Sequence, residues 1–123
     1  MADLKELIGK RLKRVEKIGD DEIVFTLKNG KRYRMYHSQD CCESVAIDDI
    51  AGDLKDLVGP PITKAEESTS DTNPPGVDKG YQDSFTWTFY HLATVNGYVT
   101  IRWYGESNGY YSESVDFVEM EGD

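Results

Sequence analysis

The sequence has little cysteine and no long apolar run. Its only cysteines, Cys41 and Cys42, are adjacent, so they cannot build a disulfide framework and they fit a reducing compartment. No stretch approaches the roughly 20 apolar residues that span a bilayer, and residues 1–6 lack the layout of a signal peptide. We therefore expect a cytoplasmic protein with no membrane partner.

Enzyme motifs are also missing from the sequence. We find no phosphate loop, no Ser-His-Asp order and no HExxH helix, and residues 105–109 (Gly-Glu-Ser-Asn-Gly) lack the strand-to-helix setting of a nucleophile elbow. Catalysis is thus unsupported, and no cofactor is expected. A binding role is favoured over an enzymatic one.

Positive charge is scarce beyond residue 37. Residues 1–37 carry ten Lys and Arg against six Asp and Glu, a net of +4, whereas residues 38–123 carry four against seventeen, a net of −13. Nucleic-acid binding rests on neutralising phosphates with basic side chains, so direct binding is not expected. The charge permits an acidic protein that occupies a nucleic-acid-binding partner, although solubility is the simpler explanation.

The length and the aromatic content favour one small domain. A chain of 123 residues with 38% hydrophobic and 11% aromatic residues can bury a single aromatic-rich core. We predict one domain over residues 1–123. Residues 69–82 hold two adjacent prolines and two glycines with almost no apolar content, which predicts a mobile loop.

The first third of the chain predicts a short helix followed by strands. Asp3 can cap a helix that ends near residue 8. Residues 10–17 fit a helix or a strand, and we favour the strand because Gly9 interrupts the helix. In the hairpin that follows, a three-residue loop with Gly30 at positive φ pairs Phe25 with Tyr33, so that both strands turn their apolar residues to one face.

The same logic predicts a second hairpin over residues 84–104. A three-residue loop at 95–97 places the apolar side chains of both strands on one face, namely Phe85, Trp87, Phe89, His91, Val99, Ile101 and Trp103. The opposite face, open to a ligand, then carries Thr86, Thr88, Tyr90, Thr100, Arg102 and Tyr104.

The remaining segments complete the predicted fold. A helix near residues 50–58, a strand near 62–68 and a last strand near 110–118 follow from their caps, prolines and alternation. We predict an α+β domain: a twisted antiparallel sheet of about six or seven strands, built from two bulged hairpins, with one or two short helices.

The aromatic and cationic residues near residue 102 form the main candidate site. Arg102, the rings around it and Asn108 could stack on a base and bind a phosphate. Alternatively, Arg102 lies across exposed rings and reaches Glu106 or Glu113. The predicted ligand-binding residues are Tyr90, Arg102, Tyr104, Asn108, Tyr110 and Tyr111, with Tyr36, Asp40 and Glu43.

The segment from residue 36 to residue 43 offers a weaker site. His37, Cys41 and Cys42 are weak metal or thiol candidates, with His91 as a further ligand, but four groups at standard spacing are not evident. The structural alternative is one buried cysteine, with Asp40 and Glu43 bonding backbone amides of the turn.

Several strings in the chain resemble a known family. YHSQDCCE at 36–43, TWTFY at 86–90 and RWYGESNGYYS at 102–112 are similar to small acidic proteins of unknown function encoded by bacteriophages and their hosts. The resemblance implies a bacterial host cell and a counter-defence role, and assigns no residue. We expect a non-enzymatic protein that sequesters a small nucleotide-like ligand or inhibits a host defence protein. An acidic nucleic-acid mimic and a small metal- or thiol-dependent enzyme are the alternatives, and homo-oligomerisation is left open.

Overall fold

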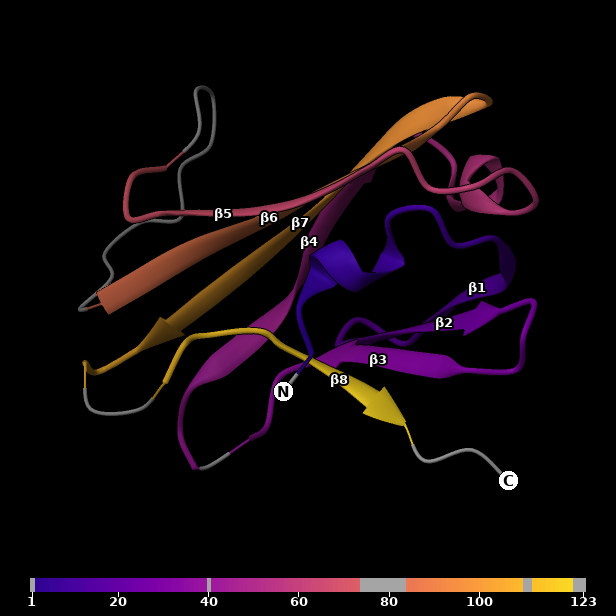
Figure 1. Cartoon of the computed structure of the whole chain (residues 1–123). Coiled ribbons are helices and arrows are strands. Elements are labelled where there is room, and N and C mark those ends of the chain that lie inside the picture. Colours follow the sequence, from indigo (N-terminus) through magenta and orange to yellow (C-terminus); the bar gives the residue numbers. More distant parts are fainter. Residues whose placement is uncertain (1, 40, 74–83, 110–111, 121–123) are drawn as a thin grey trace.

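The computed structural model describes residues 2–39, 41–73, 84–109 and 112–120. Within these residues, two antiparallel four-stranded sheets face each other, in the orders β1-β2-β3-β8 and β4-β7-β6-β5 (Figure 1). The strands are β1 (Leu12–Ile18), β2 (Glu22–Leu27), β3 (Arg32–Tyr36), β4 (Ser44–Ala51), β5 (Lys64–Ser70), β6 (Ser84–Thr94), β7 (Gly97–Ser107) and β8 (Asp116–Met120). Two single 3₁₀ turns accompany them, η1 (Leu4–Leu7) and η2 (Leu54–Leu57).

The predicted α+β class is wrong, because the described part of the chain is essentially all-β. The segment predicted as a helix at 50–58 instead ends strand β4 and then makes the single turn η2. Asp53 caps that turn by accepting a hydrogen bond from the Lys55 N–H, and Val58 is already extended, so no second turn forms. Residues 4–7 likewise form only one turn, closed by a capping box between Asp3 and Glu6.

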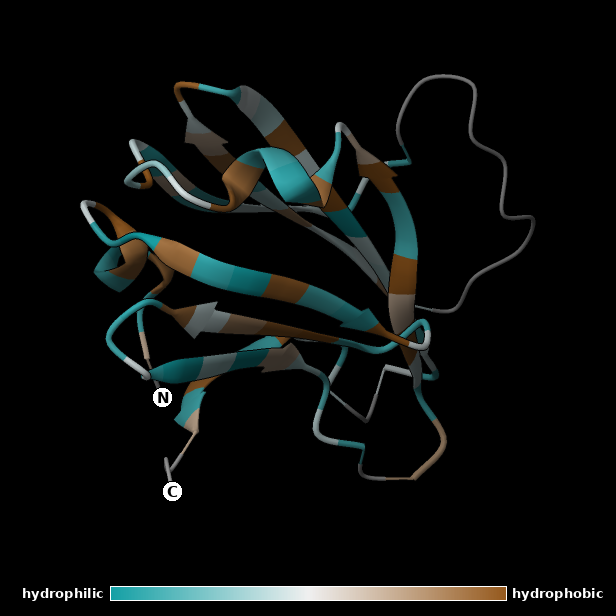
Figure 2. Cartoon of the chain, turned by 90° about the vertical axis from the view of Figure 1, so that its right-hand side faces the viewer, coloured by the Kyte–Doolittle hydropathy of each residue, from teal (hydrophilic) through white to brown (hydrophobic). Residues whose placement is uncertain are grey.

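Side chains from both sheets and both turns share one core. The sheet β1-β2-β3-β8 contributes Leu12, Ile23, Phe25, Tyr33, Met35 and Phe117, and its partner sheet contributes Ala65, Tyr90, Leu92, Val99, Ile101 and Trp103. Leu4, Leu7 and Leu57 of the turns close the core. Figure 2 shows the corresponding alternation of hydrophobic and hydrophilic residues along several strands. Such alternation is what a sheet with one buried face requires.

The first predicted hairpin is confirmed in register and loop. Phe25 lies opposite Tyr33 and Ile23 opposite Met35. Leu27 and Lys31 close the loop through backbone hydrogen bonds, and Gly30 has a φ of 96°. The strand interpretation of residues 10–17 is also confirmed, since β1 pairs with β2 along its length.

The register predicted for the second hairpin is wrong by one residue. Thr94 pairs with Gly97, so the loop has two residues, and Tyr90 lies opposite Ile101. Gly97 is not at positive φ; instead, a Cβ there would lie 2.6 Å from the Asp56 carboxylate oxygen. A side chain at position 97 would therefore have to displace the Asp56 side chain of η2, so packing against η2, rather than turn geometry, favours a glycine here. The shift turns Tyr90 into the core and leaves Trp87 on the outer face.

The other predicted segments agree only in part. The strand expected near 62–68 is β5, which runs to Ser70, and the strand expected at 110–118 begins later, at Asp116. The predicted mobile loop at 69–82 overlaps β5 at its start, and its positions 74–82 lie outside the described residues. Along the described chain, no helix has the length and apolar character needed to cross a membrane.

Candidate functional site

The outer face of the sheet β4-β7-β6-β5 carries a continuous set of aromatic side chains. The one-residue shift aligns β6 and β7 so that Trp87 lies opposite Tyr104, Phe89 opposite Arg102, and His91 opposite Thr100. We call this surface the aromatic face; it consists of Phe85, Trp87, Phe89, His91, Tyr98, Arg102 and Tyr104.

The rings of the aromatic face contact one another in two groups. The Tyr104 ring lies 4.6 Å from the Trp87 ring and 6.3 Å from the Phe85 ring, measured between centroids. At the other end, the His91 ring lies 6.2 Å from both the Phe89 and the Tyr98 rings. Such spacings suit offset or edge packing of aromatic rings and leave flat surfaces at the protein boundary. Tyr98 is 49% exposed.

Arg102 lies between the two ring groups and is held by Asp48. Its Nε and Nη2 donate to the Asp48 Oδ2 at 3.0 and 2.7 Å, and its guanidinium carbon lies 5.2 Å from the Trp87 ring centroid. The alternative interpretation of Arg102 from the sequence thus describes its contacts, but the carboxylate is Asp48 rather than Glu106 or Glu113. Other guanidinium N–H groups remain able to donate to a ligand.

The predicted ligand-binding residues are divided among several places. Arg102 and Tyr104 share the aromatic face, where the Tyr104 hydroxyl donates to Glu106 at 3.0 Å, and Asn108 lies exposed just beyond β7. Tyr90 is fully buried in the core. Tyr36 lies on the outer face of the other sheet, 3.8 Å beneath the Arg34 guanidinium. Asp40, Tyr110 and Tyr111 lie outside the described residues.

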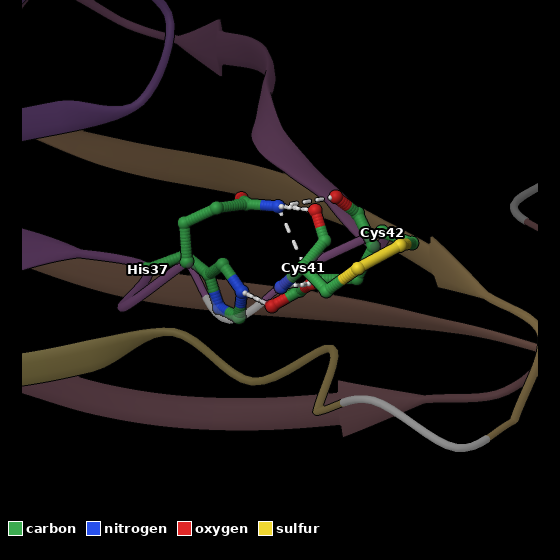
Figure 3. Close-up of a disulfide and its surroundings, with 5 residues drawn as sticks. His37, Cys41 and Cys42 are labelled. Carbon is green, nitrogen blue, oxygen red and sulfur yellow. Dashed lines mark hydrogen bonds and ion pairs between the residues drawn. A yellow bond between two sulfur atoms is a disulfide. The ribbon is translucent and has the colours of Figure 1, made fainter.

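Glu43 forms a separate buried pair with His37 (Figure 3). The His37 Nε2 lies 2.7 Å from the Glu43 Oε2, and their side chains are 3% and 0% exposed. The His37 Nδ1 faces the Ser114 carbonyl oxygen at 2.6 Å. Both imidazole nitrogens of His37 therefore lie within hydrogen-bonding distance of an oxygen atom.

The cysteines lie above this pair and are joined in a disulfide. Glu43 Oε1 accepts the Cys41 N–H at 2.9 Å, which confirms the expected carboxylate-to-amide bond in the turn. The expected buried cysteine is wrong, since both cysteines are exposed. His91 lies on the aromatic face, between Ser68 and Thr100, and not with His37. Among the described residues, no three His, Cys, Asp or Glu groups gather as metal ligands.

Comparison with models of protein families identifies the family of this chain. Residues 5–117 match a family described as a domain of unknown function, DUF7448. The chain belongs to this family. No curated protein and no solved structure matches it. The resemblance to proteins of unknown function is thereby supported, and the matched range of this DUF7448 chain includes both the aromatic face and the His37–Glu43 pair.

The sequence pattern misplaces four of the seven residues of the aromatic face. It predicts that Phe85, Trp87, Phe89 and His91 face inward, because they alternate with Ser, Thr and Tyr residues. A usable signal was present: Thr88, Tyr90 and Leu92 form an equally regular second set in the same strand. A two-residue turn at Val95 and Asn96 selects that set for the core.

Proposed function

We propose that this DUF7448 protein is a non-enzymatic binding protein that holds a small nucleotide-like ligand on its aromatic face. The observation that carries the proposal is the position of Arg102 between two groups of rings on one side of a four-stranded sheet; Trp87 beneath it is fully buried, whereas Phe85, Phe89, His91 and Tyr104 are partly exposed. Aromatic rings stack on nucleobases without regard to sequence, and a guanidinium can donate to phosphate.

The ion pair with Asp48 supports a ligand of low charge. Asp48 fixes the orientation of Arg102 in advance, which lowers the entropy lost on binding. It also offsets the positive charge of the guanidinium, and the chain has a formal net charge of −9. The offset of the Arg102 charge and the negative net charge of the chain both disfavour a triphosphate. We therefore expect a nucleoside monophosphate or a cyclic nucleotide to bind more tightly than a nucleoside triphosphate.

The biological context rests on the resemblance to phage-encoded acidic proteins. In that context, binding would sequester a nucleotide signal of host defence, or the protein would inhibit a defence protein directly. The net charge of −13 over residues 38–123 supports a second candidate, an acidic mimic of nucleic acid. Capture of a protein partner by such a mimic weakens steeply with salt.

Calorimetry with a panel of nucleotides tests the proposal. Arg102→Ala should weaken binding of the best ligand about tenfold or more, because a charge-assisted contact is lost. Arg34→Ala is the matched control: it removes a guanidinium that also pairs with a carboxylate at 2.7 Å and covers a ring, but on the other sheet. Equal loss in both variants, or no nucleotide binding by the unaltered protein, would refute the proposal.

A further inference from the structure

A cleft of about 510 Å³ opens between the edge strands of the two sheets. Its walls are β5, the residues leading into β8, and the N-terminal turn η1, which lies between the two layers in Figure 1. This volume lies within the range of small-molecule sites. The cleft is remote in the fold from the aromatic face, since β5 presents it with the inward side chains Ala65 and Glu67.

The apolar part of the cleft wall is fixed. Leu4, Ala65, Val115 and Phe117 are each at most 8% exposed. The Ala2 N–H donates to the Phe117 carbonyl at 2.9 Å, and the capping box of η1 holds the chain that follows. A wall made of buried side chains and paired backbone is preformed, so a ligand need not order it.

One end of the cleft is an acid beside a buried hydroxyl. Burial raises the pKa of Tyr90 well above its ordinary value, and the charge and hydrogen bond of the Glu67 carboxylate raise it further. The Tyr90 hydroxyl also lies 3.5 Å from the Val115 carbonyl oxygen. The hydroxyl therefore stays protonated, but Tyr90 is fully buried and is not among the residues that line the cleft, so Glu67 is the group at this end that a ligand can reach.

Three charged groups line the same cleft. Asp3 caps η1, where its carboxylate accepts the Lys5 N–H, whereas Glu67 of β5 and Lys5 of η1 are of opposite sign. Among the described residues, neither has an ion-pair partner within the 4.0 Å that defines such a pair. Neighbouring Glu66, which points to the opposite face of β5, does pair, with Lys64 at 3.7 Å. Unpaired charges across an apolar cleft are complementary to a ligand with charged ends.

We propose that this cleft binds a small zwitterion with an apolar body. The ligand's ammonium group lies against Glu67, its carbon chain lies on Leu4, Ala65 and Phe117, and its carboxylate faces Lys5. The chemical class includes ω-amino acids and amino acids with apolar side chains. This site is independent of the aromatic face and of the function proposed for it.

Titration with three matched probes, followed by amide chemical shifts in NMR, tests the inference. 5-Aminopentanoate carries both charges, whereas pentylamine and pentanoate carry one each. We expect 5-aminopentanoate to bind at millimolar concentration or below and to shift residues of β5 and η1. Each single-charge probe should bind more weakly.

Variants then separate the contacts of the ligand. Glu67→Gln should weaken 5-aminopentanoate and pentylamine about tenfold, because hydrogen bonds to charged groups are the stronger ones, while Glu66→Gln leaves both unchanged. Lys5→Met should weaken 5-aminopentanoate but not pentylamine. Arg102→Ala should have no effect. Absence of saturable shifts in the cleft, or equal effects of Glu67→Gln and Glu66→Gln, would overturn the inference.

Discussion

The outer faces of the two sheets each carry an arginine in the same local arrangement. Arg34 donates to Glu22 at 2.7 Å and lies over the Tyr36 ring, and Arg102 donates to Asp48 at 2.7 Å and lies over the Trp87 ring. An arginine that covers a ring and pairs with a carboxylate is therefore a recurrent structural element of this protein. By itself it does not indicate a ligand site.

The surroundings of the two arginines differ. Near Arg34, the strands β1 and β3 present further charged side chains, Arg14, Glu16 and Arg32, and Val24 between them is only 2% exposed. Near Arg102, the neighbours are the rings of the aromatic face: Trp87 beneath the guanidinium is fully buried, and Phe89 opposite Arg102 is partly exposed. Long charged side chains cover a sheet and keep it soluble, whereas partly exposed rings are what a binding surface requires. The proposed function depends on this contrast and not on Arg102 alone.

Alanine substitutions of an inward and an outward tyrosine should show the largest difference. Tyr90→Ala removes a fully buried ring and should lower the free energy of unfolding by about 3–5 kcal/mol. Tyr104→Ala removes a half-buried ring and should lower it by about 1 kcal/mol. Urea unfolding followed by circular dichroism measures both. Similar losses would mean that Tyr104 belongs to the core and that the aromatic face is not a free surface.

The second, smaller expected effect concerns Tyr90 and the dependence of folding stability on alkaline pH. Burial and Glu67 raise the pKa of Tyr90 in the folded state above its ordinary value of 10.0. The unfolded chain therefore loses this proton first, so stability is complete below pH 10 and falls as the pH rises above it. The slope is about 1.4 kcal/mol per pH unit.

Tyr90→Phe should remove that part of the alkaline slope, and Tyr104→Phe is the control on the outer side. The measurement is urea unfolding of the three proteins at several values of pH between neutrality and the alkaline limit of the folded state. Tyr33, whose pKa is also raised by burial and by Glu6, contributes equally to all three and cancels in the comparison. An unchanged slope in Tyr90→Phe would contradict the buried position of its hydroxyl.

The two hairpins explain how far the sequence predicts this fold. In β2 and β3 one set of positions is consistently apolar and the other is mainly polar or charged apart from Val24 and Tyr36, and Gly30 meets the positive φ of a three-residue loop, so pattern and turn agree. In β6 both alternating sets contain large side chains. The loop residues did not decide between them, because Gly97 is not at positive φ and instead packs against the side chain of Asp56, which is 41 positions earlier in the chain. A contact between residues so far apart in the chain cannot be predicted from the local sequence pattern.

The sequence predicts less of the candidate sites than it predicts of the fold. Arg102 and Tyr104 were placed correctly on an outer face, since they alternate with Ile101 and Trp103. The partner Asp48 was not predicted, because it comes from β4, which the sequence pattern did not indicate as a strand and which overlaps the helix predicted near residues 50–58 only at its end. Glu43 and His37 were recognised as neighbours in sequence, but their burial depends on Ser114, which only the completed fold brings to them.

The two tryptophans offer the most direct test of the aromatic face. The Trp87 Nε1–H donates to Asn73 at 3.0 Å beside Arg102, whereas the Trp103 Nε1–H lies in the core with no partner among the described residues. The two indole N–H signals in an NMR spectrum can be assigned with Trp87→Phe and Trp103→Phe. On titration with a cyclic nucleotide or a nucleoside monophosphate, we expect the Trp87 signal to shift in a saturable manner while the Trp103 signal stays in place. A shift confined to Trp103, or no shift in either signal, would contradict binding at the aromatic face.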